Sequence, residues 1–600
     1  MANFVVTVDP DPGRRSQFIQ TIQSLLPPVE GLVTHSCSCQ DFYACWAAHP
    51  SAPVSSIASP AGAAVVWGDA ILPGESTRMD ARGLRTLWQQ SPHPALPPFD
   101  GFYAAVAYNP YDGLTLATDI LGLFPIYYYT HGEVALVASS PELLRYHPLF
   151  KAEFNPAGLV GILLTNGLVD GQTLWQNVRR LNAGHALIWQ PQGMPKEVQQ
   201  YEFPLPTDCE SVTNQTFSEH LELLDELLTQ TLKRHAPTEQ QYTLLLSGGL
   251  DSRMLAGFLH RQGIEPVALT LGKRTDLEME CAIPIARTLK LKHHITQIPF
   301  EKYPAYAQTL IQWEHLANGG NWVMDWGMPT LLSALTPRVI SGYLLDRAIG
   351  GKTYSLPLES LTFNSFFHEG VNRWGIPPTV LEKLLRKEVF DELVPHTLAQ
   401  IQTIYNSYAK EEYKRAWWFE LRHRQRFHVG GAAWQQCFGA WPVFLALDLQ
   451  LLKITAALPD TTLAQRRAQN ELVCTRFEQL AALPLDRNDY DTQPLKPTKT
   501  RSLLARWYRL QRRWRKFQRK LGIERRYYFQ IYDINNPGWQ AVRWQAEPYR
   551  PLIKHLFDEQ VLDSLLPPPG VPIQFRRDPI TEPSGMKAIL GLMLWSKEHL

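Results

Sequence analysis

Residues 242–252 place an apolar run directly before two glycines, an aspartate and a serine. They read YTLLLSGGLDS, and the RMLAGFLHRQG that follows has the composition of a helix. This order predicts a strand, a turn and a helix N-terminus, whose N–H groups and dipole attract a phosphate group. Ser247 and Ser252 could add hydroxyl donors, and Asp251 could hold a Mg²⁺ ion. We interpret the motif as a nucleotide-binding loop; the alternative is an ordinary glycine-rich connection.

The bulk composition is that of a globular protein with more than one domain. The 600 residues carry a net charge of +1, with 19% charged and 45% hydrophobic residues, and this length exceeds one hydrophobic core. Seven cysteines lie scattered without CxxC spacing, which indicates neither a zinc site nor a disulfide framework. The N-terminal residues lack the pattern of a signal peptide, so we expect a cytoplasmic protein.

The pattern of apolar residues changes along the chain. Residues 1–205 contain short apolar runs separated by Gly, Pro and Asp, which predicts a β-rich layered domain, and the polar, proline-bearing segment 191–206 is the expected linker. From residue 217 helical and strand patterns alternate, which predicts a parallel sheet covered by helices. The expected strands are 4–8, 63–67, 103–108, 114–118, 126–129, 134–138, 242–246, 267–271 and 293–298, and the expected helices are 217–232, 252–262 and 277–289.

Several motifs in both regions resemble the asparagine synthetase family. In the first region they are WGDA (67–70), FDGFYAAVAYN (99–109), ATDILGLFPIYYY (117–129) and VASSPELLRYHP (137–148); in the second they are LLSGGLDS (245–252), LTLG (269–272) and ISGYLLDRAIGG (340–351). The resemblance implies an α/β protein: a layered α-β-β-α, nucleophile-hydrolase-like domain over 1–205, and a doubly wound parallel-sheet ATP pyrophosphatase domain over 206–480. A helical C-terminal extension over 481–600 would follow.

The resemblance also implies a nucleotide site that binds ATP and Mg²⁺. A first loop would hold pyrophosphate, a second loop would complete the site, and two acids would share the Mg²⁺ ion. The first loop comprises Ser247, Gly248, Gly249, Asp251 and Ser252, with backbone contacts from Leu246 and Leu271; the second comprises Ser341 and Gly342, and the metal-binding acids are Asp251 and Asp346.

The first domain departs from the family at the positions that hydrolyse glutamine. The family uses a cysteine at the second position as nucleophile, where this chain has Ala2, and a methyl group cannot attack an amide. The turn that grips glutamine is Trp67-Gly68-Asp69 and lacks the family's asparagine, although Asp80 matches a glutamine-binding acid. We therefore expect that glutamine hydrolysis is lost.

The second loop also departs from the family. Its third residue is Tyr343, where asparagine synthetases have a glutamate, and a tyrosine here is similar to β-lactam synthetase. Tyr343 is therefore our candidate catalytic residue, because a phenol can pass a proton; the alternative is a packing aromatic beside ATP. The family's late lysine falls on Asn470, and Lys453 or Lys496 could substitute for it.

These features favour an ATP-dependent ligase that activates a carboxylate as an acyl-adenylate, releases pyrophosphate and joins the acyl group to an amine or ammonia. The carboxylate would come from a small molecule or a peptide. Asparagine synthesis with free ammonia is the family default. The alternatives are a tailoring synthetase or cyclase, as in β-lactam synthetases and lasso-peptide cyclases, and a non-catalytic nucleotide-binding scaffold.

Residues 496–526 hold thirteen Lys and Arg and one acid, Glu524, with an aromatic and aliphatic stripe at three- and four-residue spacing. The pattern predicts one basic amphipathic helix. Over 497–526 it could lie on an anionic membrane surface, or it could pack on its own domain with a solvated basic face. A nucleic-acid partner is less favoured, because no nucleic-acid module accompanies the helix.

Overall fold

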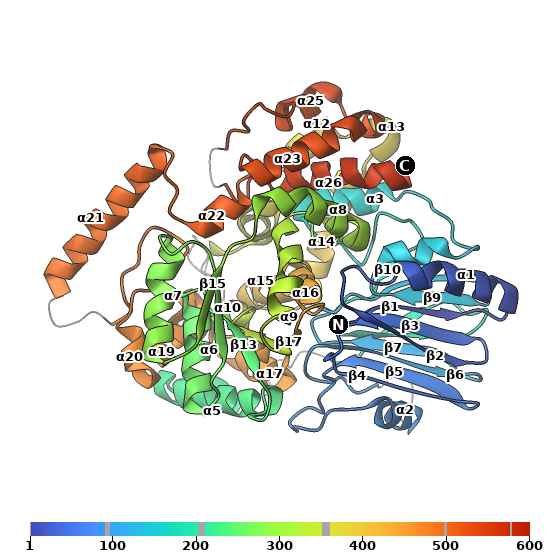
Figure 1. Ribbon diagram of the computed structural model, residues 1–600, viewed down its shortest axis with the longest axis horizontal. Helices are drawn as coiled ribbons and strands as arrows, with labels where there is room; N and C mark the ends of the chain where they lie inside the picture. The colour runs from blue at the N-terminus through green and yellow to red at the C-terminus, as the bar shows by residue number, and fades with distance from the viewer. Residues whose placement is uncertain (1, 91–95, 202–209, 351–359, 497–500, 576–578) are drawn as a thin grey trace.

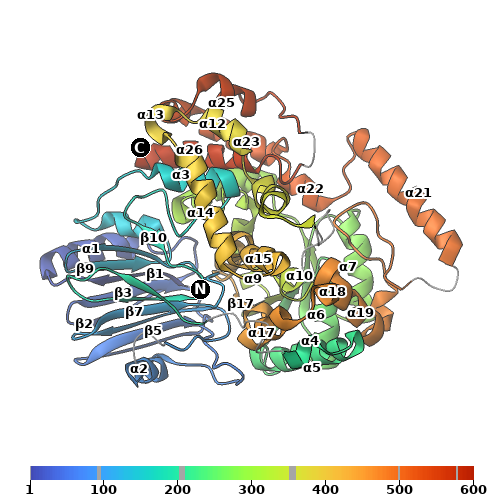
Figure 2. The ribbon, with the colours of Figure 1, turned by 180° about the vertical axis from the view of Figure 1, so that it is seen from behind.

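The computed structural model describes residues 2–90, 96–201, 210–350, 360–496, 501–575 and 579–600. Two antiparallel sheets lie at one end of the molecule, and a parallel sheet surrounded by helices forms the other half (Figure 1). The same arrangement is seen from behind in Figure 2. Among the described residues, no helix has the length and apolar character that a membrane crossing requires.

The N-terminal domain is a sandwich of two six-stranded antiparallel sheets, ordered β10-β8-β9-β1-β3-β2 and β12-β11-β7-β6-β5-β4. Strand β5 shows how the layers form, because Val65 and Trp67 join the core between the sheets while Ala64 and Val66 pack under helix α2. The strands are β1 Ala2–Val8, β2 Val33–Cys39, β3 Phe42–Ala48, β4 Val54–Ser59, β5 Gly62–Gly68, β6 Tyr103–Asn109, β7 Gly113–Thr118, β8 Tyr127–His131, β9 Val134–Ala138, β10 Arg179–Arg180, β11 His185–Trp189 and β12 Lys196–Gln199.

Helices α1 (Pro12–Leu25) and α2 (Ala81–Gln90) complete the layers. Helix α1 buries Phe18 and Ile22, and α2 buries Leu84 and Trp88 against β5. The domain therefore has the α-β-β-α layering expected for it. One detail differs from the sequence-based expectation: the segment predicted as a linker contributes β12, which pairs with β11 through its backbone.

The second domain is built on a five-stranded parallel sheet in the order β15-β14-β13-β16-β17. Helix α6 packs on β13, α7 on β14 and α16 on β17. The predicted strands and helices of this region are all present, with ends that differ by at most three residues. The elements are β13 Tyr242–Leu245, β14 Val267–Leu271, β15 His293–Thr296, β16 Arg338–Ser341, β17 Trp441–Val443, α5 Phe217–His235, α6 Leu250–Arg261, α7 Leu277–Thr288 and α16 Arg426–Gln436.

The remaining described residues are mainly helical, as the expected α/β class with a helical C-terminal part requires. These helices are α3 Pro156–Thr165, α4 Glu210–Thr213, α8 Tyr303–Glu314, α9 Met328–Ser333, α10 Leu345–Ala348, α11 Phe363–Phe366, α12 Pro378–Leu384, α13 Lys387–Phe390, α14 Leu393–Ser407, α15 Glu412–Phe419, α17 Leu449–Ala457, α18 Asp460–Leu463, α19 Arg467–Arg476, α20 Glu478–Ala481, α21 Arg501–Lys520, α22 Tyr527–Tyr532, α23 Pro537–Ala546, α24 Arg550–Ile553, α25 Glu559–Leu565 and α26 Ser584–His599.

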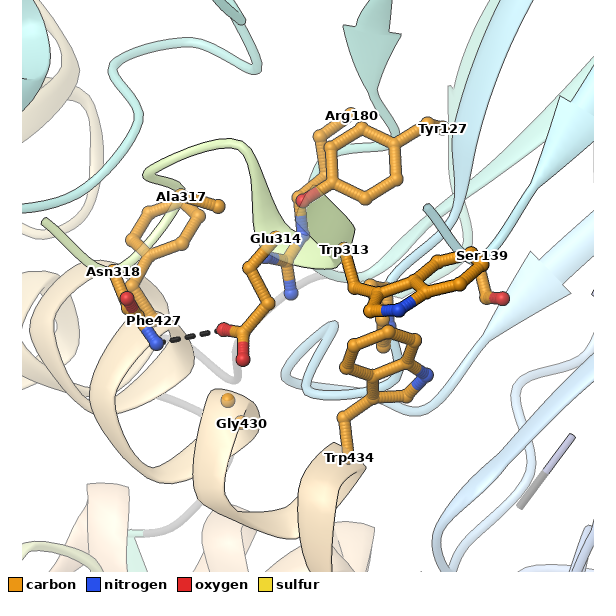
Figure 3. A pocket seen from close by; sticks show the side chains of 12 residues that line it. Tyr127, Ser139, Arg180, Trp313, Glu314, Ala317, Asn318, Phe427, Gly430 and Trp434 are labelled. Carbon is orange, nitrogen blue, oxygen red and sulfur yellow. Dashed lines mark hydrogen bonds between the residues drawn. The ribbon is translucent and has the colours of Figure 1, made fainter. Parts of the chain in front are cut away.

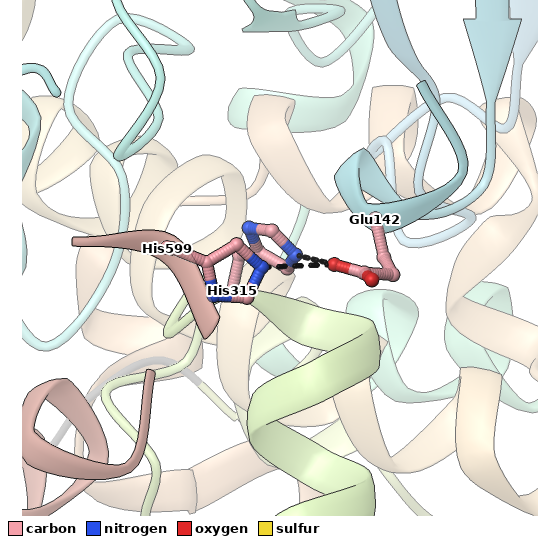
Figure 4. A group of neighbouring side chains, drawn as sticks. All are labelled: Glu142, His315 and His599. Atoms are coloured by element: carbon pink, nitrogen blue, oxygen red, sulfur yellow. Dashed lines mark hydrogen bonds and ion pairs between the residues drawn. The ribbon is translucent and has the colours of Figure 1, made fainter. Parts of the chain in front are cut away.

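The last helix, α26, joins the two halves of the molecule. It packs against α3 and α8, and His599 near its end lies 3.0 Å from the Oε2 atom of Glu142 in the N-terminal domain. His315, at the end of α8, contacts the same oxygen at 3.1 Å (Figure 4). The division of the chain at residues 205 and 480 remains a prediction: residue 205 lies outside the described residues, and residue 480 lies inside α20.

Candidate nucleotide-binding site

The turn between β13 and α6 is shaped by a glycine with a left-handed backbone. Gly248 has φ +76°, and a Cβ atom on it would lie 2.5 Å from the Cβ of Cys281, so only glycine fits against α7. Gly249 is the N-cap of α6 and provides no side-chain cap. The first N–H groups of this twelve-residue helix therefore point out of the turn without a capping side chain, which suits an anion.

Ser247 and Ser252, the two serines of the motif, are hydrogen-bonded to each other inside the turn. Their hydroxyl oxygens lie 3.1 Å apart, the N–H of Ser247 donates to the Oγ of Ser252 at 3.3 Å, and the N–H of Gly249 donates to the Oγ of Ser247 at 3.3 Å. Leu246 continues the sheet, because its N–H donates to Leu269 O at 2.9 Å. Leu271 ends the neighbouring strand β14, so its backbone lies at the same edge of the sheet.

The second loop follows β16, the other neighbour of β13. Ser341 pairs with Leu245 in the parallel register, which places Gly342 beside the start of α6. A Cβ atom on Gly342 would lie 2.8 Å from the Cβ of Asp251 and 2.9 Å from the N atom of Ser252. The two loops predicted from the sequence are therefore in contact, and glycine is required at this point.

Of the two predicted metal-binding acids, Asp346 lies close enough to Asp251 for its charge to act on the Asp251 carboxyl. Burial raises the pKa of Asp251 above its usual value, and the negative charge of Asp346 raises it further, while Arg466 lowers it. Asp346 pairs with Arg347 at 3.1 Å and keeps a third of its side chain exposed. Two carboxylates at the open edge of the sheet, beside uncapped N–H groups, fit a Mg²⁺ ion that also binds phosphate oxygens.

Arg466 and Gln469 are site residues that the sequence analysis missed. The Arg466 guanidinium donates to Oδ1 of Asp251, and Gln469 Nε2 donates to the same oxygen at 2.9 Å. Gln465 and Arg466 both have positive φ, +55° and +60°. Non-glycine residues adopt this conformation uncommonly, and such residues are enriched at functional sites. No motif signals this pair, because the two residues lie more than 200 positions from Asp251 in the sequence.

The expected lysine candidates lie elsewhere among the described residues. Asn470 donates to Gln465 O at 3.4 Å, Lys496 pairs with Glu478 at the surface at 2.7 Å, and Lys453 is exposed on α17. Arg466, four positions before Asn470, is a cation that contacts the acid of the first loop.

Tyr343 lies in the second loop, directly after Ser341 and Gly342. Its ring stacks at 6.5 Å from that of Phe444, and 37% of the residue remains exposed. Burial raises the pKa of its phenol, and the charge of Asp325 raises it further. Asp325 itself is buried in the 3-10 turn 323–327, and burial raises its pKa to about 7. No sequence motif signals Asp325, although its charge acts on Tyr343.

The chain beyond residue 480 returns to the first nucleotide loop. The Arg253 guanidinium donates to Leu480 O at 2.6 Å, to Leu483 O at 2.9 Å and to Gly248 O at 3.2 Å. The N–H of Asp486 donates to the same carbonyl of Gly248 at 3.2 Å. The loop is therefore supported in part by Leu483 and Asp486, which lie beyond residue 480, the expected end of the synthetase domain.

At the predicted glutamine site, the matching residues have structural roles. Trp67 stacks on Phe4 with ring centroids 4.1 Å apart. Asp69 is buried, pairs with Arg78 at 3.1 Å and accepts a hydrogen bond from Arg338 of β16. Asp80 is exposed and accepts from the N–H of Gly83 at 2.7 Å, so it caps α2.

A small cavity between the domains offers a second set of polar residues (Figure 3). Its carboxylate, Glu314, accepts from Asn318 Nδ2 at 2.6 Å and from Trp326 Nε1 at 3.2 Å. Burial raises its pKa to about 7. Because the carboxylate already accepts hydrogen bonds from its neighbours, we assign Glu314 a structural role at the domain interface rather than a catalytic role.

Two family models match the chain. The asparagine synthase model matches residues 223–536, just over half of the sequence, and a glutamine amidotransferase domain model matches residues 75–202. The chain belongs to the asparagine synthase family. Family membership and the two loops together make the second domain that of an ATP-using, amide-forming ligase. No curated protein matches the chain.

Three solved structures show partial similarity. The predicted tRNA methyltransferase subunit of Methanocaldococcus jannaschii has 18% identity, covers 21% of this chain and 60% of its own, and has a TM-score of 0.14. NMN synthetase from Francisella tularensis has 16% identity, with 36% and 96% covered and a TM-score of 0.19. Glutamine phosphoribosylpyrophosphate amidotransferase from B. subtilis has 10% identity, with 50% and 81% covered and a TM-score of 0.22. These TM-scores are too low to carry an argument about function.

Proposed function

We propose that the protein binds MgATP, activates a carboxylate as an acyl-adenylate with release of pyrophosphate, and joins the acyl group to an amine. The observation that carries this proposal is the contact between the two loops, in which Gly342 packs on Asp251. That contact puts the N-terminus of α6, Asp251 and Asp346 at one edge of the sheet. Anionic leaving groups need positioning and positive charge, and this edge supplies both.

Each group then has a defined role. The N–H groups at the start of α6 and the Ser247 and Ser252 hydroxyls would bind the pyrophosphate portion of ATP. Asp251 and Asp346 would hold Mg²⁺, which neutralises the phosphate charge when bound. Arg466 contacts Asp251, and we propose that it supplies the positive charge that the family's lysine otherwise gives.

Glutamine is not the nitrogen source in this proposal. Asp69 is committed to Arg78 and Arg338, and Trp67 is stacked inside the sandwich. The turn that would grip glutamine is therefore part of the interface between the domains. A domain of this kind would serve as a scaffold, and the amine would arrive as ammonia or as part of the substrate.

The second candidate for the nucleophile is an amine that belongs to the substrate, and the presence of Tyr343 favours it. We propose Tyr343 as the residue that handles the proton of the attacking amine, because it lies in the second loop and is partly exposed. Its raised pKa keeps the phenol protonated unless a carboxylate accepts the proton. Asp325, whose charge acts on Tyr343, is the acid that we propose for that role.

Carboxylate-dependent exchange of labelled pyrophosphate into ATP tests the proposal. Exchange with aspartate supports the asparagine type of reaction, and exchange only with larger amino-carboxylates or peptides supports the tailoring type. Asp346→Asn should abolish exchange, whereas Asp225→Asn, at a surface ion pair with Arg261, should not. ATP binding without exchange for any acid would contradict the ligase and point to a nucleotide-binding scaffold.

A further inference from the structure

Helix α21 lies at the edge of the molecule, at the end opposite the N-terminal sheets (Figures 1 and 2). One face of this twenty-residue helix is fixed to the body. Arg515 is buried, pairs with Glu280 of α7, and donates to Tyr490 O at 3.3 Å and to Thr492 Oγ1 at 3.2 Å. Arg512 pairs with Asp489 on the same side.

The opposite face of α21 is apolar and exposed. Successive residues of a helix are rotated by about 100°, so residues two positions apart point about 200° from each other. Leu510 and Trp514 each lie two positions from Arg512, and Phe517 lies two positions after Arg515. These three apolar side chains therefore point away from the anchored face. The exposed fractions of the stripe are 49% for Trp507, 63% for Leu510, 58% for Trp514, 50% for Phe517 and 61% for Leu521.

This stripe is not part of the hydrophobic core. Its residues have large side chains, and single exposed apolar residues are common on proteins, but a contiguous row of five marks a site of interaction. Ile523, just after the helix, is also apolar and exposed, with an exposed fraction of 51%. Because its opposite face is anchored through Arg512 and Arg515, α21 could bury this row against its own domain only by breaking those contacts.

The charge of α21 indicates what kind of partner the helix would bind. The helix carries nine Lys and Arg and no acid. On the helical projection, Arg506, Arg513 and Lys520 border the stripe and are exposed. They form no ion pair within the described part of the chain. A partner must therefore accept an apolar row and a row of cations side by side.

We propose that α21 binds the surface of an anionic lipid bilayer, with the stripe at the acyl boundary and Arg506, Arg513 and Lys520 among the phosphates. Tryptophan and phenylalanine beside arginine suit the interface of a bilayer, where amphipathic helices lie in the membrane plane. A second copy of the chain is a poorer partner, because Arg506, Arg513 and Lys520 beside the stripe would lie near the same cations of the other copy. RNA would pair with the basic rows but would leave most of the apolar stripe in water.

Co-sedimentation of the full chain with vesicles tests this proposal. Vesicles of phosphatidylcholine with phosphatidylglycerol should bind the protein, and pure phosphatidylcholine vesicles should bind it much less. Arg506→Gln with Arg513→Gln and Lys520→Gln should weaken binding on the order of 100-fold, since each basic residue near an anionic surface contributes about fivefold. Trp514→Ala with Phe517→Ala should weaken it at least about tenfold.

The matched control is Trp544→Ala, which removes a 61% exposed tryptophan from α23 and should leave vesicle binding unchanged. All variants should keep wild-type ATP binding, which shows that they are folded. Equal binding to both kinds of vesicle, or unchanged binding of the Trp514 and Phe517 variant, would overturn the proposal. It would also be overturned by a stable dimer that depends on the stripe, or by binding to single-stranded RNA that vesicles do not displace.

Discussion

The guanidinium of Arg466 donates a hydrogen bond to Oδ1 of Asp251, so a cation preceding α19 touches the acid in the first turn of α6. Gln469 shares the same oxygen at 2.9 Å. The contact connects three segments, because the N–H of Arg466 also donates to Gly350 O, after the second loop, at 3.1 Å.

Asp251→Asn should lower carboxylate-dependent pyrophosphate exchange on the order of 10²–10³-fold. The substitution keeps the size of the side chain but removes one of two carboxylates that would hold Mg²⁺. Exchange is measured across a Mg²⁺ titration, with Asp225→Asn as the control for a surface acid. A variant that exchanges at the wild-type rate at every Mg²⁺ concentration would remove Asp251 from the metal site.

Arg466→Gln should lower the exchange rate by a similar factor, and mainly through kcat, if Arg466 stabilises charge that develops in the reaction. Arg466→Lys should recover part of the rate, because it keeps the charge but not the planar fork. Arg467→Gln is the matched control: its guanidinium stacks 3.9 Å from the ring of Phe217 on the outside of the domain. Equal rates for Arg466→Gln and Arg467→Gln would show that Arg466 serves only to fix the loop.

Gly342→Ala should prevent tight ATP binding while the rest of the protein stays folded. The new Cβ would lie 2.8 Å from Asp251 Cβ and main-chain carbon, a distance that forces the two loops apart. Isothermal calorimetry with ATP measures the effect. Gly13→Ala is the control, because only the flexible carboxylate of Asp11 lies near its added Cβ, at 3.2 Å. Wild-type ATP affinity for Gly342→Ala would show that the loop contact does not form the site.

The sequence predicted strands β13, β14 and β15 and the two loops, but not strands β16 and β17 or the contacts that support the loops. Strands β13 and β14 are short apolar runs, and parallel strands bring their carboxyl ends to one edge of the sheet. The contact of Arg466 with Asp251 and the effect of Asp325 on Tyr343 depend on segments that meet only in the folded chain and follow no local pattern. The amphipathic pattern of α21 predicted a helix, but periodicity alone could not tell which face was covered.

Asp69→Ala should destabilise the protein by about 3–5 kcal/mol, because it leaves Arg338 buried between the domains without its carboxylate. Asp80→Ala, at the neighbouring candidate glutamine position, should cost only about 0.5–2 kcal/mol, the usual value of a helix cap. Thermal unfolding of the two variants measures the difference. If the order of the two costs were reversed, Asp69 would not have the structural role assigned to it.

The junction of Glu142 with His315 and His599 should make the protein labile to acid. Burial lowers the pKa of His315 to about 4. Burial alone would raise the pKa of Glu142, but hydrogen bonds from His315 and His599 lower it to about 2. Both groups therefore bind fewer protons in the folded protein than in the unfolded chain. Their contribution is complete above the unfolded pKa values and is lost as the pH falls through the folded ones.

The hydrogen bonds of His315 show which of its two ring nitrogens carries the proton in the neutral form. Trp595 Nε1 donates to His315 Nδ1 at 3.1 Å, so the other ring nitrogen carries the proton that is donated to Glu142. His315→Gln can form the same two hydrogen bonds but cannot titrate. The wild-type protein should lose on the order of 3 kcal/mol from His315 between about pH 7 and pH 4, and His315→Gln should lose less. Melting temperatures across this range measure the effect, with exposed His131→Gln as the control. Parallel pH profiles for the wild type and His315→Gln would exclude this junction as the source of acid lability.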